Sequence, residues 1–307
     1  MTGRDDLGAG APRYTAIELA RASGLPHPPT PEQVAVIEAP LRPMLVVAGA
    51  GSGKTETMAG RVVWLVANGF VAPEHILGLT FTRKAAAELA ERVGLRLRRL
   101  ADAGLLPPTL DEHGAQSLAG VPTVSTYHAY SGRLVSEHGL RLGIEPDTRL
   151  LTEAAAWQYA AEAVARYDGD MDEVPNAEST VIGAVVDLAG ELAEHLLEVG
   201  DLRDEIDRIV AAIDAAPPAR PGAALPADVL KLRATLRARR EVLPIVSRFQ
   251  QLKRSRDAMD FADQVALAAR LATEIPEVGS IERRRFHAVL LDEFQDTSEA
   301  QLALLRG

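Results

Sequence analysis

The sequence contains no cysteine, and only four of its 33 basic residues are lysines. The absence of cysteine excludes disulfide bonds, thiolate metal sites and an iron–sulfur cluster within these 307 residues. No uninterrupted apolar run reaches the length of a membrane span, and the polar start Met1–Asp6 lacks a charged and then apolar leader. We therefore expect a cytoplasmic protein with no membrane partner.

The overall charge is acidic, with a formal net charge of −10, and 47% of the residues are hydrophobic. That apolar content suffices for one large domain or two smaller ones. A net negative charge argues against a nucleic-acid partner unless the cations gather locally. They do gather, in residues 96–99, 231–240, 253–256 and 283–285. Each run is either a solvated helix face or part of a basic track for a nucleic-acid strand.

A glycine-rich segment, A-G-A-G-S-G-K-T, covers Ala48–Thr55 and follows the apolar run M-L-V-V. Its glycines let backbone N–H groups curl around phosphates, Lys54 adds a mobile cation, and the Thr55 hydroxyl can hold Mg²⁺. A lysine at position 54 is informative because 29 of the 33 basic residues are arginines. The alternative is a glycine-rich turn with a solvated lysine. The predicted triphosphate-binding residues of the segment are Ala48, Gly49, Ala50, Gly51, Ser52, Gly53, Lys54 and Thr55.

Two adjacent carboxylates, Asp292 and Glu293, follow the apolar run Ala288–Leu291. A buried strand that ends in this pair can deliver one carboxylate to a metal ion and leave the other as a general base. We therefore expect Asp292 to hold Mg²⁺ through water and Glu293 to activate the attacking water. Taken alone, such a pair is more often a solvated strand end. Its combination with the glycine-rich segment favours catalysis.

Several segments together resemble the motifs of superfamily 1 DNA helicases of the UvrD/Rep/PcrA type, in matching order and spacing from about residue 28 to the end. The amino-acid sequence of some segments is most similar to that of the AdnB group of actinobacterial helicase–nuclease subunits. The matching segments are the Q motif at Gln33, motif I at 48–55, motif Ia at 79–89, motif Ib at 123–130, the D-F-x-D segment at 259–263 and motif II at 290–298.

The resemblance implies a role for individual residues. Gln33 would bind the adenine edge, and Gln295 would sense the γ-phosphate and join Lys54, Asp292 and Glu293 in the catalytic set. Phe81 would offer a stacking face to a base. The remaining residues expected to contact DNA are Thr80, Thr82, Arg83, Tyr127 and His128. Relatives often carry Asn where Arg83 stands and Arg where Glu56 stands, and the second difference puts a contact beside the base in doubt.

Some of these residues have a plain structural interpretation. Phe81 ends an apolar run and is, without the resemblance, more typical of a core residue. Tyr127 and His128 could equally be packed and hydrogen-bonded inside the fold. Asp260 and Asp263 stand at the start of an apolar helix, where helix capping explains them, so we assign them no catalysis.

Strand patterns alternate with helical patterns, which indicates an α/β fold of the P-loop NTPase, RecA-like class: a parallel sheet with helices on both faces. The expected strands are Met44–Ala48, Ile76–Phe81, Thr123–Ser125 and Ala288–Leu291. Strand signals vanish between about residues 140 and 256, so an all-helical subdomain is expected there. The predicted divisions are a lead-in at 1–27, the first part of the ATP-binding domain at 28–139, the helical subdomain at 140–256 and the second part of the ATP-binding domain at 257–307.

The expected function is the N-terminal, ATP-binding half of an ATP-dependent 3′-to-5′ DNA helicase, with ATP and Mg²⁺ as cofactors. Single-stranded DNA, or a duplex with a single-stranded tail, would be its substrate, and a helicase–nuclease subunit a further partner. The resemblance implies a second motor domain and an arginine finger beyond Gly307, so the chain alone is expected not to unwind DNA. Two alternatives stay open: a non-catalytic DNA-binding motor subunit and an unrelated P-loop phosphotransferase.

Overall fold

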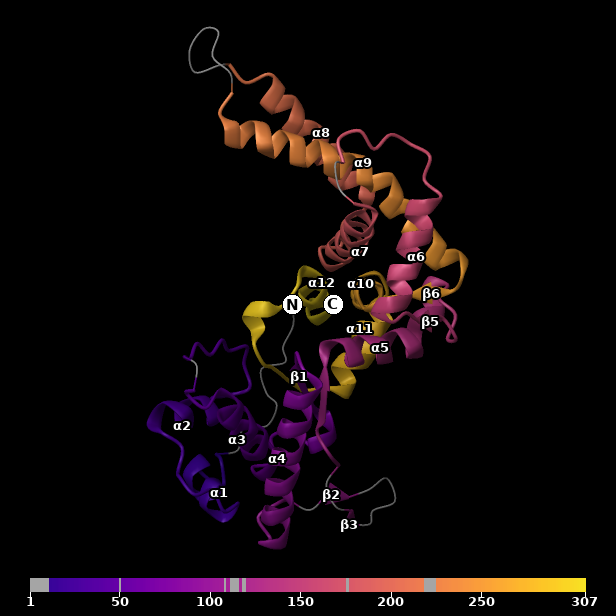
Figure 1. Cartoon of the computed structure of the whole chain (residues 1–307). Coiled ribbons are helices and arrows are strands. Elements are labelled where there is room, and N and C mark those ends of the chain that lie inside the picture. The colour runs from indigo at the N-terminus through magenta and orange to yellow at the C-terminus, as the bar shows by residue number, and fades with distance from the viewer. Residues whose placement is uncertain are drawn as a thin grey trace. The chain divides into compact units, whose positions relative to one another are not determined.

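The computed structural model describes residues 11–49, 51–107, 109–110, 116–117, 120–174, 177–217 and 225–307. The chain divides into two compact units (Figure 1). The first comprises the described residues up to Tyr130 together with Ser280–Asp296, and the second comprises Ser131–Gly279 and Thr297–Gly307. The second unit therefore interrupts the first along the sequence. The finer domain boundaries expected from the sequence remain a prediction.

The first unit is built on a parallel sheet of three strands in the order β4-β1-β7. These strands are β1 (Ile76–Thr80), β4 (Thr123–Thr126) and β7 (Ala288–Leu291). All five residues of β1 are buried, as a central strand covered on both faces requires. A parallel sheet flanked by helices confirms the predicted fold class. The other elements are α1 (Ala16–Ala22), α2 (Pro31–Ile37), α3 (Lys54–Ala67), α4 (Arg83–Asp102), short 3₁₀ turns at Pro73–His75 and Phe294–Asp296, and the strand pair β2 (Thr109–Leu110) and β3 (Gln116–Ser117).

The core of the first unit lies between α3, α4 and the sheet. In α4, Leu89, Val93, Leu97 and Leu100 recur at three- and four-residue spacing, so one face of the helix is apolar and buried. Each such side chain contributes about 1.5 to 3 kcal/mol when it is removed from water. This packing fixes α3 and α4 against each other, and the loop before α3 carries the glycine-rich segment.

The predicted strand at Met44–Ala48 is wrong: these residues form no strand in the structure. Leu45 is 73% exposed and Val47 is 88% exposed. An apolar run becomes a strand only where a neighbouring strand accepts and donates its ladder hydrogen bonds. Among the described residues, no strand of any sheet pairs with this segment.

The second unit is mainly helical, as expected for residues 140–256. In Figure 1, α8 lies along α9 and the two helices form a hairpin. A short strand, β5 (Arg149–Leu150), nevertheless pairs with β6 (Ala258–Met259), and a two-residue strand is too short to leave a periodic signal. The helices are α6 (Glu153–Ala165), α7 (Glu178–Glu194), α8 (Val199–Asp214), α9 (Ala227–Ser255), α10 (Phe261–Glu274) and α12 (Glu299–Arg306), with a 3₁₀ turn at Gly139–Leu142. Two further helices, α5 (Tyr127–His138) and α11 (Pro276–Arg285), run across the unit boundaries in sequence.

A buried charged cluster joins α9 to the start of α10. Lys253, whose side chain is 3% exposed, lies 2.5 Å from Asp260 Oδ2 and 2.6 Å from Asp263 Oδ2. Asp260 also caps α10 and exchanges capping hydrogen bonds with Asp263. Burial raises the pKa of Asp263, with Lys253 opposing that rise. The capping interpretation of these aspartates is therefore confirmed.

Many cations of the basic runs are paired with acidic residues inside their own unit. Arg233 and Arg237 both bind Asp214, and Arg240 binds Asp207. These contacts leave less of the run at 231–240 for a nucleic-acid track than the sequence indicates. Within the part of the chain that the structure describes, we find no helix with the length and apolar character that a bilayer span requires.

Candidate nucleotide-binding site

The glycine-rich segment leads directly into α3, and two of its glycines have left-handed backbone conformations. Gly51 has φ 76° and Gly53 has φ 82°. A Cβ at Gly53 would come within 2.8 Å of Gln33 Nε2. The dihedral angle favours glycine at position 53, and a side chain there would also displace the Gln33 amide. Gly49 and Ser52 close the turn through a backbone hydrogen bond of 3.4 Å, while Ala50 lies outside the described residues.

The N-terminus of α3 presents its first-turn amides beside Lys54 and Thr55. Gly53 is the N-cap, and a glycine brings no side chain to satisfy these N–H groups. The amides and the helix dipole together favour an anion at this end of the helix. Thr57 Oγ1 donates to Gly53 O at 3.0 Å, which ties the first turn to the loop.

The two predicted carboxylates follow β7 where expected. Asp292 N donates to Leu79 O at 2.9 Å, which continues the parallel ladder one residue beyond the strand. Asp292 Oδ1 then accepts from Glu293 N at 3.1 Å. Glu293 has φ 48°, a left-handed conformation that costs of order 1 to 3 kcal/mol for a non-glycine residue.

The structure brings the glycine-rich segment and the carboxylate pair together through Lys54 and Glu293. Lys54 Nζ lies 3.3 Å from Glu293 Oε2, and the two side chains are 34% and 40% exposed. Gln295 Nε2 also donates to Glu293 Oε2. The hydrogen bond from Gln295, followed by the one from Lys54, lowers the pKa of Glu293. Glu293 is therefore an ionised carboxylate at neutral pH, which is the form that accepts a proton from water.

Gln33 contacts the glycine-rich segment from α2. Its Nε2 donates to Ser52 O at 3.0 Å, and its Oε1 accepts from Thr30 N at 3.0 Å. Thr30 caps α2 in return, so the reciprocal capping box fixes the Gln33 side chain. The side-chain amide of Gln33 thus lies at the edge of the glycine-rich segment, and hydrogen bonds fix both its nitrogen and its oxygen.

These residues fit a magnesium-bound triphosphate. Left-handed glycines, the amides of a helix N-terminus and a lysine suit phosphates, and an aspartate and a threonine hydroxyl are hard oxygen donors of the kind Mg²⁺ prefers. Lys54 and the first-turn amides would hold the phosphates, and Thr55 with Asp292 would hold the metal. Bound Mg²⁺ would supply charge neutralisation at the phosphoryl oxygens.

The residues predicted to contact DNA begin at the end of β1. Thr82 caps α4 by accepting from Ala85 N, and Thr82 and Arg83 are exposed. Phe81 is half-buried, and its ring centroid lies 5.0 Å from that of Tyr127. Thr80 is 1% exposed, and its Oγ1 donates to Thr82 O at 3.1 Å. Of these four residues, Thr82 and Arg83 are exposed, Phe81 is half-buried and Thr80 is buried.

The second predicted DNA segment opens α5. Tyr127 is only 1% exposed, whereas His128 is half-buried. A side chain that is fully packed cannot stack on a base in this conformation. Tyr127 instead packs against the ring of Phe81, with the two rings tilted by 46°.

Two arginines of α4 that bind Glu56 were not predicted from the sequence as part of any site. Arg92 and Arg96 stand four residues apart and so share a face of the helix, and both contact the Glu56 carboxylate. From the sequence, the run at 96–99 indicates either a solvated face or a DNA track. A sequence pattern could have distinguished these arginines from a solvated surface. Their four-residue spacing places them beside the buried leucines of α4.

Comparison with known protein families gives a match to the UvrD/REP helicase N-terminal domain over residues 29–307. The chain belongs to this family. Among curated relatives, it is 27% identical over 264 residues to the ATP-dependent DNA helicase UvrD1 of Mycobacterium leprae, an alignment that covers 86% of the chain and 28% of that protein. It is 26% identical over 279 residues to the ATP-dependent DNA helicase PcrA of Staphylococcus aureus, covering 90% of the chain and 30% of that protein. The chain thus spans less than a third of the length of these relatives.

Proposed function

We propose that this chain binds ATP with Mg²⁺ and forms the nucleotide-binding part of a longer ATP-dependent DNA helicase. The observation that carries the proposal is the contact between Lys54 and Glu293, which unites a phosphate-binding lysine with a candidate general base. Membership of a helicase family sets aside the alternative of an unrelated phosphotransferase.

Each site residue has a proposed role in that reaction. Lys54 neutralises the outer phosphates, and Thr55 with Asp292 holds Mg²⁺. Glu293 accepts a proton from the attacking water, an assignment supported by its position 3.3 Å from the phosphate-binding Lys54. Gln295 senses the γ-phosphate through the same carboxylate to which it donates. Gln33 binds the adenine edge.

DNA binding is proposed for the segment after β1. Phe81 stacks on a base, while Thr82 and Arg83 bind phosphate oxygens, which suits a half-buried ring and two exposed polar residues. His128 contributes from α5. Thr80 and Tyr127 act through their neighbours, since both are 1% exposed.

The finer assignments rest on the resemblance. We propose movement in the 3′-to-5′ direction on single-stranded DNA, kinship with the AdnB type of helicase–nuclease subunit, and work in the cytoplasm with a partner subunit. Because the chain matches less than a third of the length of the two curated relatives, we also propose that this chain does not unwind DNA by itself. DNA unwinding would require two motor domains to close around ATP.

Calorimetric titration of the chain with ATP and Mg²⁺ tests the core of the proposal. Saturable binding at one site, lost on removal of Mg²⁺ with a chelator, is expected. A chain that is folded by circular dichroism yet gives no heat with either ATP or inorganic tripolyphosphate would contradict it.

A further inference from the structure

A cavity of about 430 Å³ adjoins the glycine-rich segment within the first unit. Its walls come from α1, α2, α3, α4 and the segment between α1 and α2, and they include Pro28, Thr30, Gln33, Glu56 and Arg96. That volume lies within the usual range for small-molecule pockets. Gln33 is common to the cavity and to the contact with Ser52 O, so the cavity borders the predicted phosphate site.

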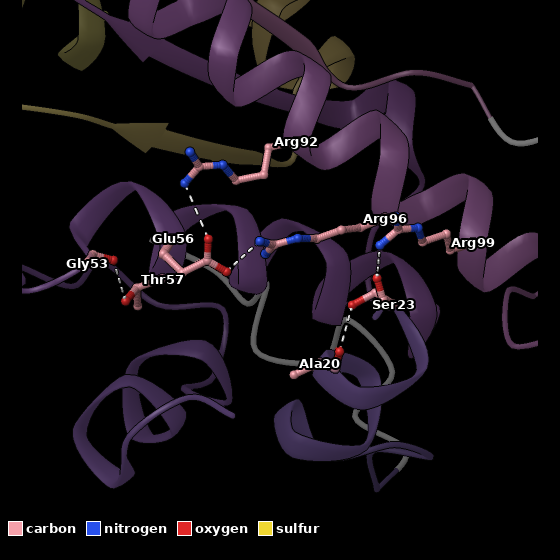
Figure 2. A network of polar contacts seen from close by, with 8 residues as sticks. All are labelled: Ala20, Ser23, Gly53, Glu56, Thr57, Arg92, Arg96 and Arg99. Carbon is pink, nitrogen blue, oxygen red and sulfur yellow. Dashed lines mark hydrogen bonds and ion pairs between the residues drawn. The ribbon is translucent and has the colours of Figure 1, made fainter. Parts of the chain in front are cut away.

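A polar network fixes one wall of this cavity (Figure 2). Glu56, in the first turn of α3, receives Arg92 Nη1 at 3.3 Å and Arg96 Nη2 at 2.5 Å. Arg99, farther along α4, donates to Ser23 O at 2.7 Å and so ties α4 to the end of α1. The arginines of α4 therefore tie α4 to α3 and to the end of α1, three of the helices that line the cavity.

The two arginines that bind Glu56 differ in their surroundings. The Arg96 side chain is 10% exposed and lines the cavity, whereas the Arg92 side chain is 38% exposed and is not among the lining residues. One carboxylate with two guanidinium groups leaves the cluster with a single net positive charge. A guanidinium is planar, so it can stack on an aromatic ring as well as donate hydrogen bonds.

We propose that Arg96 contacts the nucleotide base in this cavity and that Glu56 is a positioning residue that holds the guanidinium in place. The inference rests on the proposed binding of a nucleoside triphosphate at the glycine-rich segment. It adds a base-recognition residue from α4, the helix that begins with Thr82 as its cap. The phosphates are bound by Lys54 and the first-turn amides of α3, whereas Arg96 reaches the cavity from α4, so loss of Arg96 is expected to affect the base more than the phosphates.

The test compares two probes, ATP and inorganic tripolyphosphate, each with Mg²⁺ and each titrated by calorimetry. Arg96→Met removes the planar cation and keeps the apolar stem. It is expected to weaken ATP binding by about 2- to 30-fold, the range for a cation beside an aromatic ring, with a smaller change for tripolyphosphate. Arg92→Met is the matched control, because it removes the other partner of Glu56 and should leave the preference for ATP over tripolyphosphate unchanged.

A charge-matched variant removes the effect of net charge. Glu56→Gln combined with Arg96→Met keeps one net positive charge through Arg92, and it leaves no uncompensated carboxylate to unfold the helix pair. This double variant is expected to bind tripolyphosphate like the parent and to lose affinity for ATP as Arg96→Met does. Arg96→Lys, which keeps the charge and loses the planar group, should show the same selective loss.

The outcomes separate the inference from the function on which it rests. If the parent protein binds neither probe, both the proposed function and the inference about Arg96 are wrong. If the parent binds both probes equally, or if the double variant keeps its full preference for ATP, the base does not use Arg96 and only the inference fails. Equal losses for Arg92→Met and Arg96→Met would assign both arginines to structure alone.

Discussion

Lys54 Nζ lies 3.3 Å from Glu293 Oε2, although the two residues are 239 positions apart in the sequence. One residue opens α3 after a glycine-rich turn, and the other follows β7 in a left-handed conformation. The parallel pairing of β7 with β1 fixes where the carboxylate pair emerges from the sheet. This contact places the predicted phosphate-binding lysine directly beside the candidate general base.

Lys54→Ala removes the cation that directly follows the glycine-rich turn. Affinity for ATP with Mg²⁺ should fall by about 10- to 100-fold, since a hydrogen bond to a charged group contributes about 1.5 to 3 kcal/mol. Calorimetric titration measures the change. Lys84→Ala is the control, because the Lys84 side chain is 88% exposed and pairs with Glu88 on the same helix. Equal affinity of Lys54→Ala and the parent would contradict the phosphate-binding role.

Glu293→Gln keeps the size of the side chain and removes its basicity. In the longer helicase that we propose, ATP binding should persist while the turnover number falls by about 100-fold or more, the usual contribution of a general base. Steady-state ATPase assays give the rate, and Glu299→Gln provides an exposed control. Turnover at the parent rate would show that another group activates the water.

Gln295→Ala should raise the pKa of Glu293. In the native protein the hydrogen bond from Gln295 stabilises the carboxylate first and Lys54 stabilises it second, so the folded-state pKa lies below its ordinary value. The charged form, and any stabilisation it brings, is therefore present above the ordinary pKa and is lost as pH falls through the lowered one. Removing the donor moves this transition to higher pH. A titration by carbon NMR, assigned with Glu293→Gln, measures the shift, and an unmoved resonance would contradict the assignment.

Phe81→Ala tests the DNA segment. If a base stacks on this half-buried ring, single-strand affinity should drop by about 1 to 3 kcal/mol. Fluorescence anisotropy with a labelled oligonucleotide measures it, and Trp157→Ala removes an aromatic side chain that is 42% exposed in the helical unit as a control. Unchanged affinity for single-stranded DNA, together with lowered thermal stability, would show that Phe81 is a structural core residue and does not contact a base.

Lys253→Met leaves Asp260 and Asp263 without their buried cation. The free energy of unfolding should fall by about 3 to 5 kcal/mol near neutral pH, as for other broken buried pairs. Burial already raises the pKa of Asp263, so this carboxylate takes up a proton in the variant as the pH falls. Protonation removes the unpaired buried charge, and the loss in free energy of unfolding should therefore shrink towards acidic pH. Chemical denaturation at two pH values measures both effects, with exposed Lys231→Met as the control. A loss independent of pH would indicate a packing defect instead.

The sequence predicted those parts of the fold and site that depend on local pattern. Strand β7 has the predicted bounds, because a short apolar run closed by two carboxylates is unambiguous. The segment at Met44–Ala48 has the same apolar character but no strand partner among the described residues, and pairing cannot be read from one segment alone. Within the site, the sequence indicated Lys54 and Glu293 separately, and only the fold brings them together.

Charge was the harder property to predict. The arginines at 96 and 99 belong to a run that resembles a nucleic-acid track, yet Arg96 binds Glu56 and Arg99 binds Ser23 O. Lys253 likewise lies in a basic run and is buried against two aspartates. Basic residues on a helix reach partners set by tertiary packing, so their local density does not tell whether they face solvent, a ligand or another helix.

The most direct test of the central claim is the ATPase rate with and without single-stranded DNA, measured on this chain and on the protein of full length. A helicase motor predicts strong stimulation by DNA in the full-length protein, abolished by Lys54→Ala, and little or no turnover by the present chain. Rapid turnover by the present chain that DNA does not change would contradict the account and indicate a self-sufficient ATPase.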